Sequence, residues 1–348
     1  MARYLSLLFC SAVALVVVVA SDREVHAQTS RQNSGHTVGT AGAPARWTTP
    51  RTPWGDPDLQ GTYTNKYETG TPFERPKEFE GRRISDVSRD ELTAAVRKRQ
   101  EDTLARAKFF GGDPAGLIGN SAEFRDIYEI ERGSRPWFVV DPPDGQIPPI
   151  LPAARARIAA QPRAGGSFGN GPFNGPEDFS LWDRCITRGL PGSMLPGNYG
   201  NSYEIVQAPG VVAIRYEMVH DTRVIPLGPS PRSHAGTRIT MDMGDARGYW
   251  DGDTLVVETT NFKARSTYRN AHADTLRLIE RFTRTAAGTI EWSVTVDDPS
   301  TWARPWTFAI PLTMNDEEQV FEYACHEGNQ AIRNILSAAR TAEREGVK

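Results

Sequence analysis

Beyond its first twenty residues the chain has no long apolar run, and neither sign of charge dominates it. It carries 40 Lys and Arg residues against 43 Asp and Glu residues, for a formal net charge of −3. A balanced charge gives no reason to expect a nucleic acid or an anionic membrane surface as a partner. No second stretch is long and apolar enough to span a bilayer, so no stable membrane anchor is predicted after the first segment.

Sequence motifs for metal proteases, nucleotide binding and paired-cysteine metal sites are also missing. The chain contains no HExxH, no P-loop, no dinucleotide-binding fingerprint and no CxxC, so no cofactor is predicted. A divalent metal is the alternative, because imidazole and carboxylate groups are common ligands. The ligands would come from a set widely scattered in the sequence: His220, His234 and His326, with Glu327 or Glu280.

The first 27 residues have the features of a cleavable secretory signal. Arg3 provides a positive charge, the run 5–20 is almost wholly apolar, and Val25 and Ala27 fit a cleavage site. Residues 1–27 are therefore predicted to be removed, which places a mature protein beginning near Gln28 in the periplasm or outside the cell. The alternative is an uncleaved membrane anchor, for which the run is slightly short.

Export would leave two of the three cysteines, Cys185 and Cys325, in an oxidising compartment. Disulfides form and persist in such compartments. We therefore expect one bridge that closes the loop between these two residues. The alternative is a pair of buried, unpaired thiols.

Composition divides the mature chain into three segments. Residues 28–46 are rich in Ser, Gly, Thr and Ala and are expected to be a disordered leader. Residues 47–180 are expected to be a loop-rich extension with one amphipathic helix, which Ser88 and Glu91 begin as a capping box. Residues 181–348 are expected to form an antiparallel β-barrel domain with a C-terminal helix that could cap it.

The β prediction rests on the alternation of apolar and polar residues. Apolar side chains occupy every second position in 212–218 and 290–296, as in half-buried antiparallel strands. Asp251 and Gly252 predict a tight hairpin. About eight strands follow one another with short connections, which favours an up-and-down barrel or a strongly curved meander. Further strands are expected at 221–227, 246–250, 254–260, 275–284, 305–313 and 319–325.

Two titratable residues are predicted on apolar faces of these strands. The alternation that begins at Val212 places His220 inward, and Glu280 shares its face with Leu278 and Phe282. A histidine and a carboxyl group that face one cavity are what acid–base chemistry on a bound molecule requires.

His220 and Glu280 are therefore predicted as the acid–base pair, with Arg223 as the anchor for an anionic group and Asp221 beside them. The structural alternative is a buried Glu–Arg pair that fixes the strand register, because a carboxylate in an apolar interior is costly unless it is paired. The partner of Glu280 would then be one of three arginines, Arg215, Arg223 or Arg281.

Further polar and aromatic residues are predicted to bind the substrate: Tyr216, Trp302, Arg304, His326 and Glu327. If the disulfide forms, it brings His326 and Glu327 against the segment around Cys185. Trp302 is either a core residue or a stacking wall for an aromatic or sugar ligand.

Several long segments resemble those of a family of exported bacterial proteins for which no reaction is established. They are TPWGDPDLQG at 52–61, TPFERP at 71–76, VDPPDG at 140–145, RCITRGLP at 184–191, EMVHDTR at 217–223, WDGDTLVV at 250–257 and YACHEGN at 323–329. The resemblance covers the mature chain and implies a lipocalin-like barrel behind an N-terminal extension. It implies no ligand and no catalytic residue. The loop 228–233 departs from the family pattern, which argues against a role for His234.

These observations predict an exported, cofactor-independent enzyme that acts on a small aromatic or cyclic molecule. A lyase, such as a dehydratase or decarboxylase, and a hydrolase are the expected classes. The alternative is a non-catalytic barrel that binds an apolar small ligand, with Glu280 neutralised by a neighbouring arginine. The expected partner in either case is a small molecule, and the sequence leaves the oligomeric state open.

Overall fold

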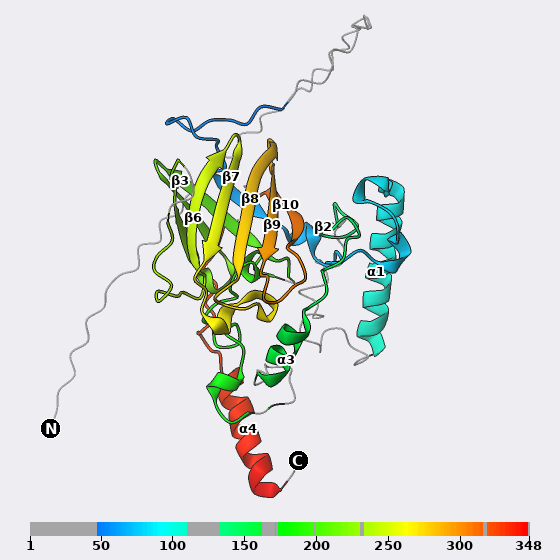
Figure 1. The fold of residues 1–348 in the computed structure, drawn as a ribbon. Coiled ribbons are helices and arrows are strands. Elements are labelled where there is room, and N and C mark those ends of the chain that lie inside the picture. The colour runs from blue at the N-terminus through cyan, green and yellow to red at the C-terminus, as the bar shows by residue number, and fades with distance from the viewer. Residues whose placement is uncertain are drawn as a thin grey trace, which may run out of the picture. The chain divides into compact units, whose positions relative to one another are not determined.

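One antiparallel sheet of ten strands dominates the chain in the computed structural model (Figure 1). The structure describes residues 47–109, 133–161, 171, 173–197, 199–229, 233–315 and 319–346. The predicted signal peptide and leader fall on residues 1–46 and lie outside this part. Nine strands follow one another around a nearly closed barrel, and β2 (Val139–Asp141) pairs with β10 (Trp306–Met314) off this path. The mainly β barrel predicted from the sequence is confirmed.

The barrel consists of two meanders joined by one short strand. The first meander comprises β3 (Ser202–Ala208), β4 (Val211–Tyr216) and β5 (Thr222–Pro226). The second continues through β6 (Asp245–Asp251), β7 (Thr254–Thr260), β8 (Arg277–Ala286), β9 (Thr289–Asp297) and β10. β1 (Gly61–Thr64) pairs with β3 on one side and β10 on the other. Residues 47–180, expected as an extension, therefore supply two strands of the sheet to which 181–348 supply the rest.

The two edges of the sheet meet where β5 ends beside β6. Leu227 forms an isolated parallel bridge with Gly248, and Gly228 N donates to Gly248 O at 3.0 Å. A Cβ atom at Gly248 would lie 2.7 Å from the Leu227 side chain and 2.9 Å from that of Ile225. Glycine therefore permits the close approach that nearly closes the barrel.

Connections of different length separate the two ends of the barrel. One end has tight hairpins, including the predicted one between β6 and β7, where Gly252 has a left-handed φ of 60°. The other end bears the longer connections 261–276 and 298–305 and the start of β3. We call this second end the loop-bearing end.

The predicted alternation is confirmed in both segments from which it was derived. In β4 the residues Val212, Ile214 and Tyr216 are buried, and β9 buries every second residue in the same way. Large aromatic side chains fill the interior, where the Trp292 ring lies 5.7 Å from that of Phe308 in an edge-to-face arrangement. The interior is therefore packed as a hydrophobic core.

The strand expected at 319–325 is not formed in its described residues, and this prediction was wrong. Residues 319–324 have no regular structure, a turn begins at Cys325, and the Phe321 side chain is 69% exposed. The reason lies in the topology, because β1 and β2 already pair with β10 and leave no edge there for another strand.

The described residues contain three α-helices: α1 (Arg89–Phe109), α3 (Pro152–Ala160) and α4 (Ala331–Glu345). The predicted capping box of α1 is present, with Glu91 N donating to Ser88 Oγ at 3.3 Å and Ser88 N donating to Glu91 Oε2 at 2.9 Å. The C-terminal helix is confirmed, but none of its residues is buried. It therefore does not pack into the barrel core, and Arg340 joins it to Phe173 O at 2.8 Å. No described helix has the length and apolar character needed to cross a bilayer.

Candidate functional site

The predicted site residue Glu280 lies inside the barrel in an ion pair with Arg223. Arg223 Nη2 donates to Glu280 Oε1 at 3.2 Å, and Nη1 donates to the other carboxylate oxygen. Trp292 Nε1 donates to Glu280 Oε1 at 3.1 Å. The Arg223 and Glu280 side chains are 3% and 0% exposed. Both carboxylate oxygens are thus engaged and shielded from solvent.

This arrangement corresponds to the structural alternative for Glu280. Burial opposes the charge on Arg223, but the Glu280 carboxylate outweighs this effect and raises the pKa of Arg223. The other two candidate partners lie elsewhere, because Arg215 pairs with Glu204 and Arg281 pairs with Asp251. The pair links β5 to β8, which come from different meanders, and so fixes their relative position.

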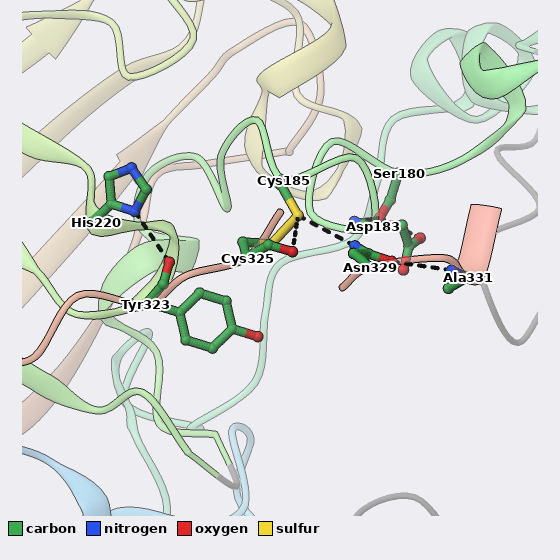
Figure 2. Close-up of a disulfide and its surroundings, with 8 residues drawn as sticks. All are labelled: Ser180, Asp183, Cys185, His220, Tyr323, Cys325, Asn329 and Ala331. Atoms are coloured by element: carbon green, nitrogen blue, oxygen red, sulfur yellow. Dashed lines mark hydrogen bonds between the residues drawn. A yellow bond between two sulfur atoms is a disulfide. The ribbon is translucent and has the colours of Figure 1, made fainter. Parts of the chain in front are cut away.

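His220 does not face the barrel interior, and the expectation that it does was wrong. β4 ends at Tyr216, and a 3-10 turn follows in which Val219 and His220 have left-handed φ angles of 61° and 43°. This backbone turns His220 outward, where its Nδ1 lies 3.1 Å from the carbonyl oxygen of Tyr323 (Figure 2). The acid–base pair of His220 and Glu280 is therefore not assembled.

Of the remaining predicted residues, Tyr216 lies near the Arg223–Glu280 ion pair and interacts with both charges, whereas Asp221 and Arg304 form hydrogen bonds with other residues. The Tyr216 hydroxyl is buried in the barrel without a hydrogen-bond partner in the described part of the chain. Asp221 accepts a hydrogen bond from Thr187 Oγ1 at 2.8 Å. Arg304 is exposed and donates to Asp141 at 3.1 Å. The hydrogen bonds of Asp221 and Arg304 therefore do not contribute to the ion pair in the barrel.

The aromatic and C-terminal candidates also separate. Trp302 is buried and packs edge to face against Trp306, with ring centroids 5.7 Å apart, so it is a core residue. His326 and Glu327 are exposed in the turn that follows Cys325. The disulfide fixes the chain next to them without bringing either side chain into a buried site.

The histidines do not form a metal site within the described ranges. No three His, Cys, Asp or Glu side chains in these ranges are placed to hold one ion. His234 lies between two carboxylates, with Nδ1 3.1 Å from Asp245 and Nε2 3.3 Å from Glu258. Both of its ring nitrogens are thus engaged.

A cleft of about 800 Å³ lies beside α1, and Glu68 is the buried acid that lines it. The Glu68 carboxylate accepts one hydrogen bond from Ser134 N at 3.1 Å and another from Thr71 Oγ1 at 3.4 Å. Burial raises the pKa of Glu68, while these donors oppose the rise. The carboxylate therefore has a structural use, which is to tie the loop at 68 to the segment at 134.

The predicted disulfide between Cys185 and Cys325 is present (Figure 2). The two Cα atoms lie 5.7 Å apart although 140 positions separate them in the sequence. The bridge therefore holds the segment that precedes β3 against the segment that follows β10. Trp182 and Arg188 lie three residues on either side of Cys185, and Tyr323 lies two residues before Cys325.

The aromatic rings of Trp182, Tyr199 and Tyr323 lie around Arg188. We call these four residues the Arg188 cluster. The guanidinium carbon of Arg188 lies 4.9 Å from the centre of the Trp182 ring. The rings of Tyr199 and Tyr323 stack at 6.1 Å with an angle of 18° between their planes, and their hydroxyl groups share a hydrogen bond.

Arg188 has no acidic partner in this setting. It donates no hydrogen bond to the described residues and forms no ion pair with them, and it is only partly exposed. Burial lowers the pKa of Arg188, and the nearby Tyr203, Tyr199 and Tyr323 act in the opposite direction. A guanidinium remains charged at neutral pH. The cluster therefore presents an uncompensated positive charge next to aromatic surface.

The sequence contained a signal for this cluster that was not used. The expected disulfide between Cys185 and Cys325 already implied that the residues flanking the two cysteines lie together. Arg188 was part of the segment RCITRGLP, and Tyr323 was part of YACHEGN. The lack of an acidic partner for Arg188 is a three-dimensional property, and no sequence pattern could reveal it.

Comparisons with known proteins add no family to this description. No family model matches the chain, and no match was found among curated proteins or among solved structures.

Proposed function

We propose that the protein binds a small anionic molecule, outside the cytoplasm, at the loop-bearing end of its barrel. The observation that carries this proposal is the uncompensated Arg188 beside Trp182, Tyr199 and Tyr323. A guanidinium offers a fork of donors that matches carboxylate and phosphate oxygens. Hydrogen bonds to charged groups contribute about 1.5–3 kcal/mol each.

The barrel serves as the scaffold of the site in this proposal. Tyr203 in β3 is fully buried next to Arg188, and its hydroxyl donates to Asn65 Oδ1 at 3.1 Å. Asn65 follows β1 and donates to Met194 O at 2.7 Å. The loop that carries Arg188 is thus attached to two adjacent strands as well as to the disulfide, so the cation is held in position before any ligand arrives.

The extracellular location is proposed on two grounds. The first 27 residues have the features of a secretory signal, and a bridge such as Cys185–Cys325 persists in oxidising compartments. Intact-mass measurement of the protein recovered from the periplasm or medium tests this part. A mass that corresponds to a start near Gln28 supports the proposal, provided that it is about 2 Da lower in the oxidised than in the reduced sample, as expected for one disulfide. A full-length cytoplasmic product contradicts it.

Enzymatic activity of the lyase or hydrolase class stays a prediction. The pair on which it relied is separated, because Glu280 is engaged by Arg223 and His220 lies on the exterior. The binding alternative accommodates this arrangement, although the site we propose is at the barrel end rather than in the apolar interior.

A screen of small anions against the mature protein tests the binding proposal. Thermal unfolding of the wild type, Arg188→Gln and Arg281→Gln would be followed with carboxylates, inorganic phosphate and their neutral analogues. Arg281 is a matched control because it is an exposed barrel arginine paired with Asp251. Stabilisation of the wild type and the control, but not of Arg188→Gln, supports the proposal. Equal stabilisation of all three proteins, or of none by any anion, contradicts it.

A further inference from the structure

We infer that the ligand of the Arg188 cluster is the monoanionic carboxylate of an aromatic compound, rather than a phosphate. This inference rests on the proposed function and specifies the chemical class of the ligand. Three observations support it: the single positive charge of Arg188, a neighbouring carboxylate and the exposed surface of the aromatic rings.

The cluster supplies one positive charge. Three tyrosines act on the charge of Arg188, and Arg188 is the cation that lowers the pKa of Tyr323. Free phosphate and phosphate monoesters carry a charge of about −1.5 to −2 near pH 7. A single guanidinium neutralises a carboxylate and leaves a phosphate with excess charge in a partly desolvated position.

A carboxylate close to the cluster strengthens this discrimination. Burial raises the pKa of Tyr323 to about 12, and the charge of Glu217 acts in the same direction. Glu217 is held in place, because its Oε2 accepts a hydrogen bond from Ser202 N at 3.1 Å. The repulsion between Glu217 and a bound anion doubles when the ligand charge changes from −1 to −2.

The aromatic rings indicate what carries the carboxylate. Trp182 is 40% exposed and Tyr199 is 38% exposed, so both rings present accessible surface beside Arg188. Flat aromatic compounds stack on such rings in offset or edge-to-face arrangements. A carboxylate attached to an aromatic ring can therefore reach Arg188 while its ring lies against Trp182 or Tyr199.

The two stacked tyrosines complete the recognition of an acid. Their shared hydrogen bond uses one hydroxyl proton, and a phenol hydroxyl can donate one bond and accept others. With the pKa of Tyr323 at about 12, its proton is retained at physiological pH. The cluster thus offers the guanidinium donors of Arg188 and the protonated phenol of Tyr323 to an acid.

Four probes test the inference by isothermal titration with the oxidised mature protein: benzoate, acetate, inorganic phosphate and the neutral benzamide. We expect benzoate to bind at least about tenfold more tightly than each of the other three. Arg188→Gln should weaken benzoate binding about tenfold or more, and Arg188→Lys should restore part of the loss. Trp182→Leu should reduce the preference for benzoate over acetate about three- to tenfold, as expected for loss of one ring contact.

Different outcomes separate this inference from the proposed function. Phosphate that binds as tightly as benzoate, with a loss in Arg188→Gln, would overturn the choice of carboxylate and leave anion binding intact. Acetate that matches benzoate would overturn the aromatic assignment. Benzoate affinity that is the same in the wild type and in a folded Arg188→Gln variant would overturn both. The unfolding midpoint of each variant, measured in parallel, shows whether a loss of binding comes from loss of the fold.

Discussion

Two arginines of this barrel differ in almost every respect except their chemistry. Arg223 lies in the interior, where Glu280 takes up its charge and Trp292 completes the hydrogen bonding of the carboxylate. Arg188 lies at the loop-bearing end among aromatic rings and forms no ion pair with any residue that the structure describes. The first arrangement is complete within the protein, whereas the second leaves the guanidinium available to the ligand that we propose.

The contrast separates a charge that folding explains from one that it does not. A buried charge that has its counter-ion is explained by folding, because removal of either partner leaves the other stranded in an apolar interior. A partly desolvated charge without an ion-pair partner is not explained in this way, and we propose ligand binding as its role. Arg188 rather than Glu280 therefore identifies the candidate site.

The largest expected effect comes from breaking the interior pair. Arg223→Gln should reduce the free energy of unfolding by about 3–5 kcal/mol, since it leaves the Glu280 carboxylate buried without a counter-ion. Arg215→Gln is the matched control, because Arg215 pairs with Glu204 on the exposed surface and such pairs contribute about 0–1 kcal/mol. Urea unfolding followed by fluorescence measures both changes, and equal losses in the two variants would contradict the structural role of Arg223.

Removal of the disulfide is expected to affect both stability and binding. Replacement of Cys185 and Cys325 by serine opens a loop of 140 residues and should reduce the free energy of unfolding by about 2–5 kcal/mol. The same double variant should bind benzoate more weakly, because Tyr323 is no longer tied to the segment of Arg188. Calorimetric titration below the unfolding midpoint checks the second effect. Unchanged affinity would show that the bridge does not position the cluster.

The pH dependence of binding provides a smaller and more selective test. Burial raises the pKa of Tyr323 to about 12, so this phenol stays neutral until the solution is strongly alkaline. Its deprotonation would add a negative charge beside the anion and weaken binding as the pH rises through that value. We therefore expect benzoate affinity to stay constant from about pH 8 to about pH 9.5, where no carboxylate, guanidinium or imidazole of ordinary pKa titrates. A progressive loss of affinity across this interval would mean that an anionic phenolate forms in the site at much lower pH.

The parts of the fold that follow from short-range patterns were predictable from the sequence. In β4 and β9 every second residue is apolar, and these residues are buried. The turn at Gly252 and the capping box of Ser88 and Glu91 also depend on residues within a few positions of one another. Local steric and hydrogen-bonding preferences decide such features, so their signal is present in the sequence.

The parts that depend on distant pairing were not predictable in the same way. β1 and β2 contain only four and three residues, too few for a periodic pattern, and their position is decided by partners far along the chain. The expected strand at 319–325 fails for the same reason, because β1 and β2 pair with β10 in its place. The outward turn of His220 depends on left-handed backbone at Val219, a conformation that a β-branched residue rarely adopts.

For the interior pair, the sequence predicts the buried Glu280 but does not identify the arginine that pairs with it. The alternation of β8 places Glu280 inward, and the high free energy of burying an unpaired carboxylate predicts a counter-ion. Which of the three arginines supplies it depends on the barrel closing so that β5 faces β8. The Arg188 cluster depends likewise on a tertiary arrangement, since its defining feature is the lack of a partner.

The most direct test of the account measures stability and binding in one experiment. The urea midpoint of the wild type and of Arg188→Gln would be determined with and without benzoate. Without ligand, we expect the free energies of unfolding of the two proteins to differ by no more than about 1 kcal/mol. Arg188 has no ion pair with the described residues to lose, and one cation–π contact contributes about that much. Benzoate at about one hundred times the wild-type dissociation constant should stabilise the wild type by about 2.7 kcal/mol, and it should stabilise Arg188→Gln by no more than about 1.4 kcal/mol, because the variant binds at least about tenfold more weakly. A variant that is much less stable without ligand, or that benzoate stabilises as much as the wild type, would contradict the assignment of Arg188 to binding.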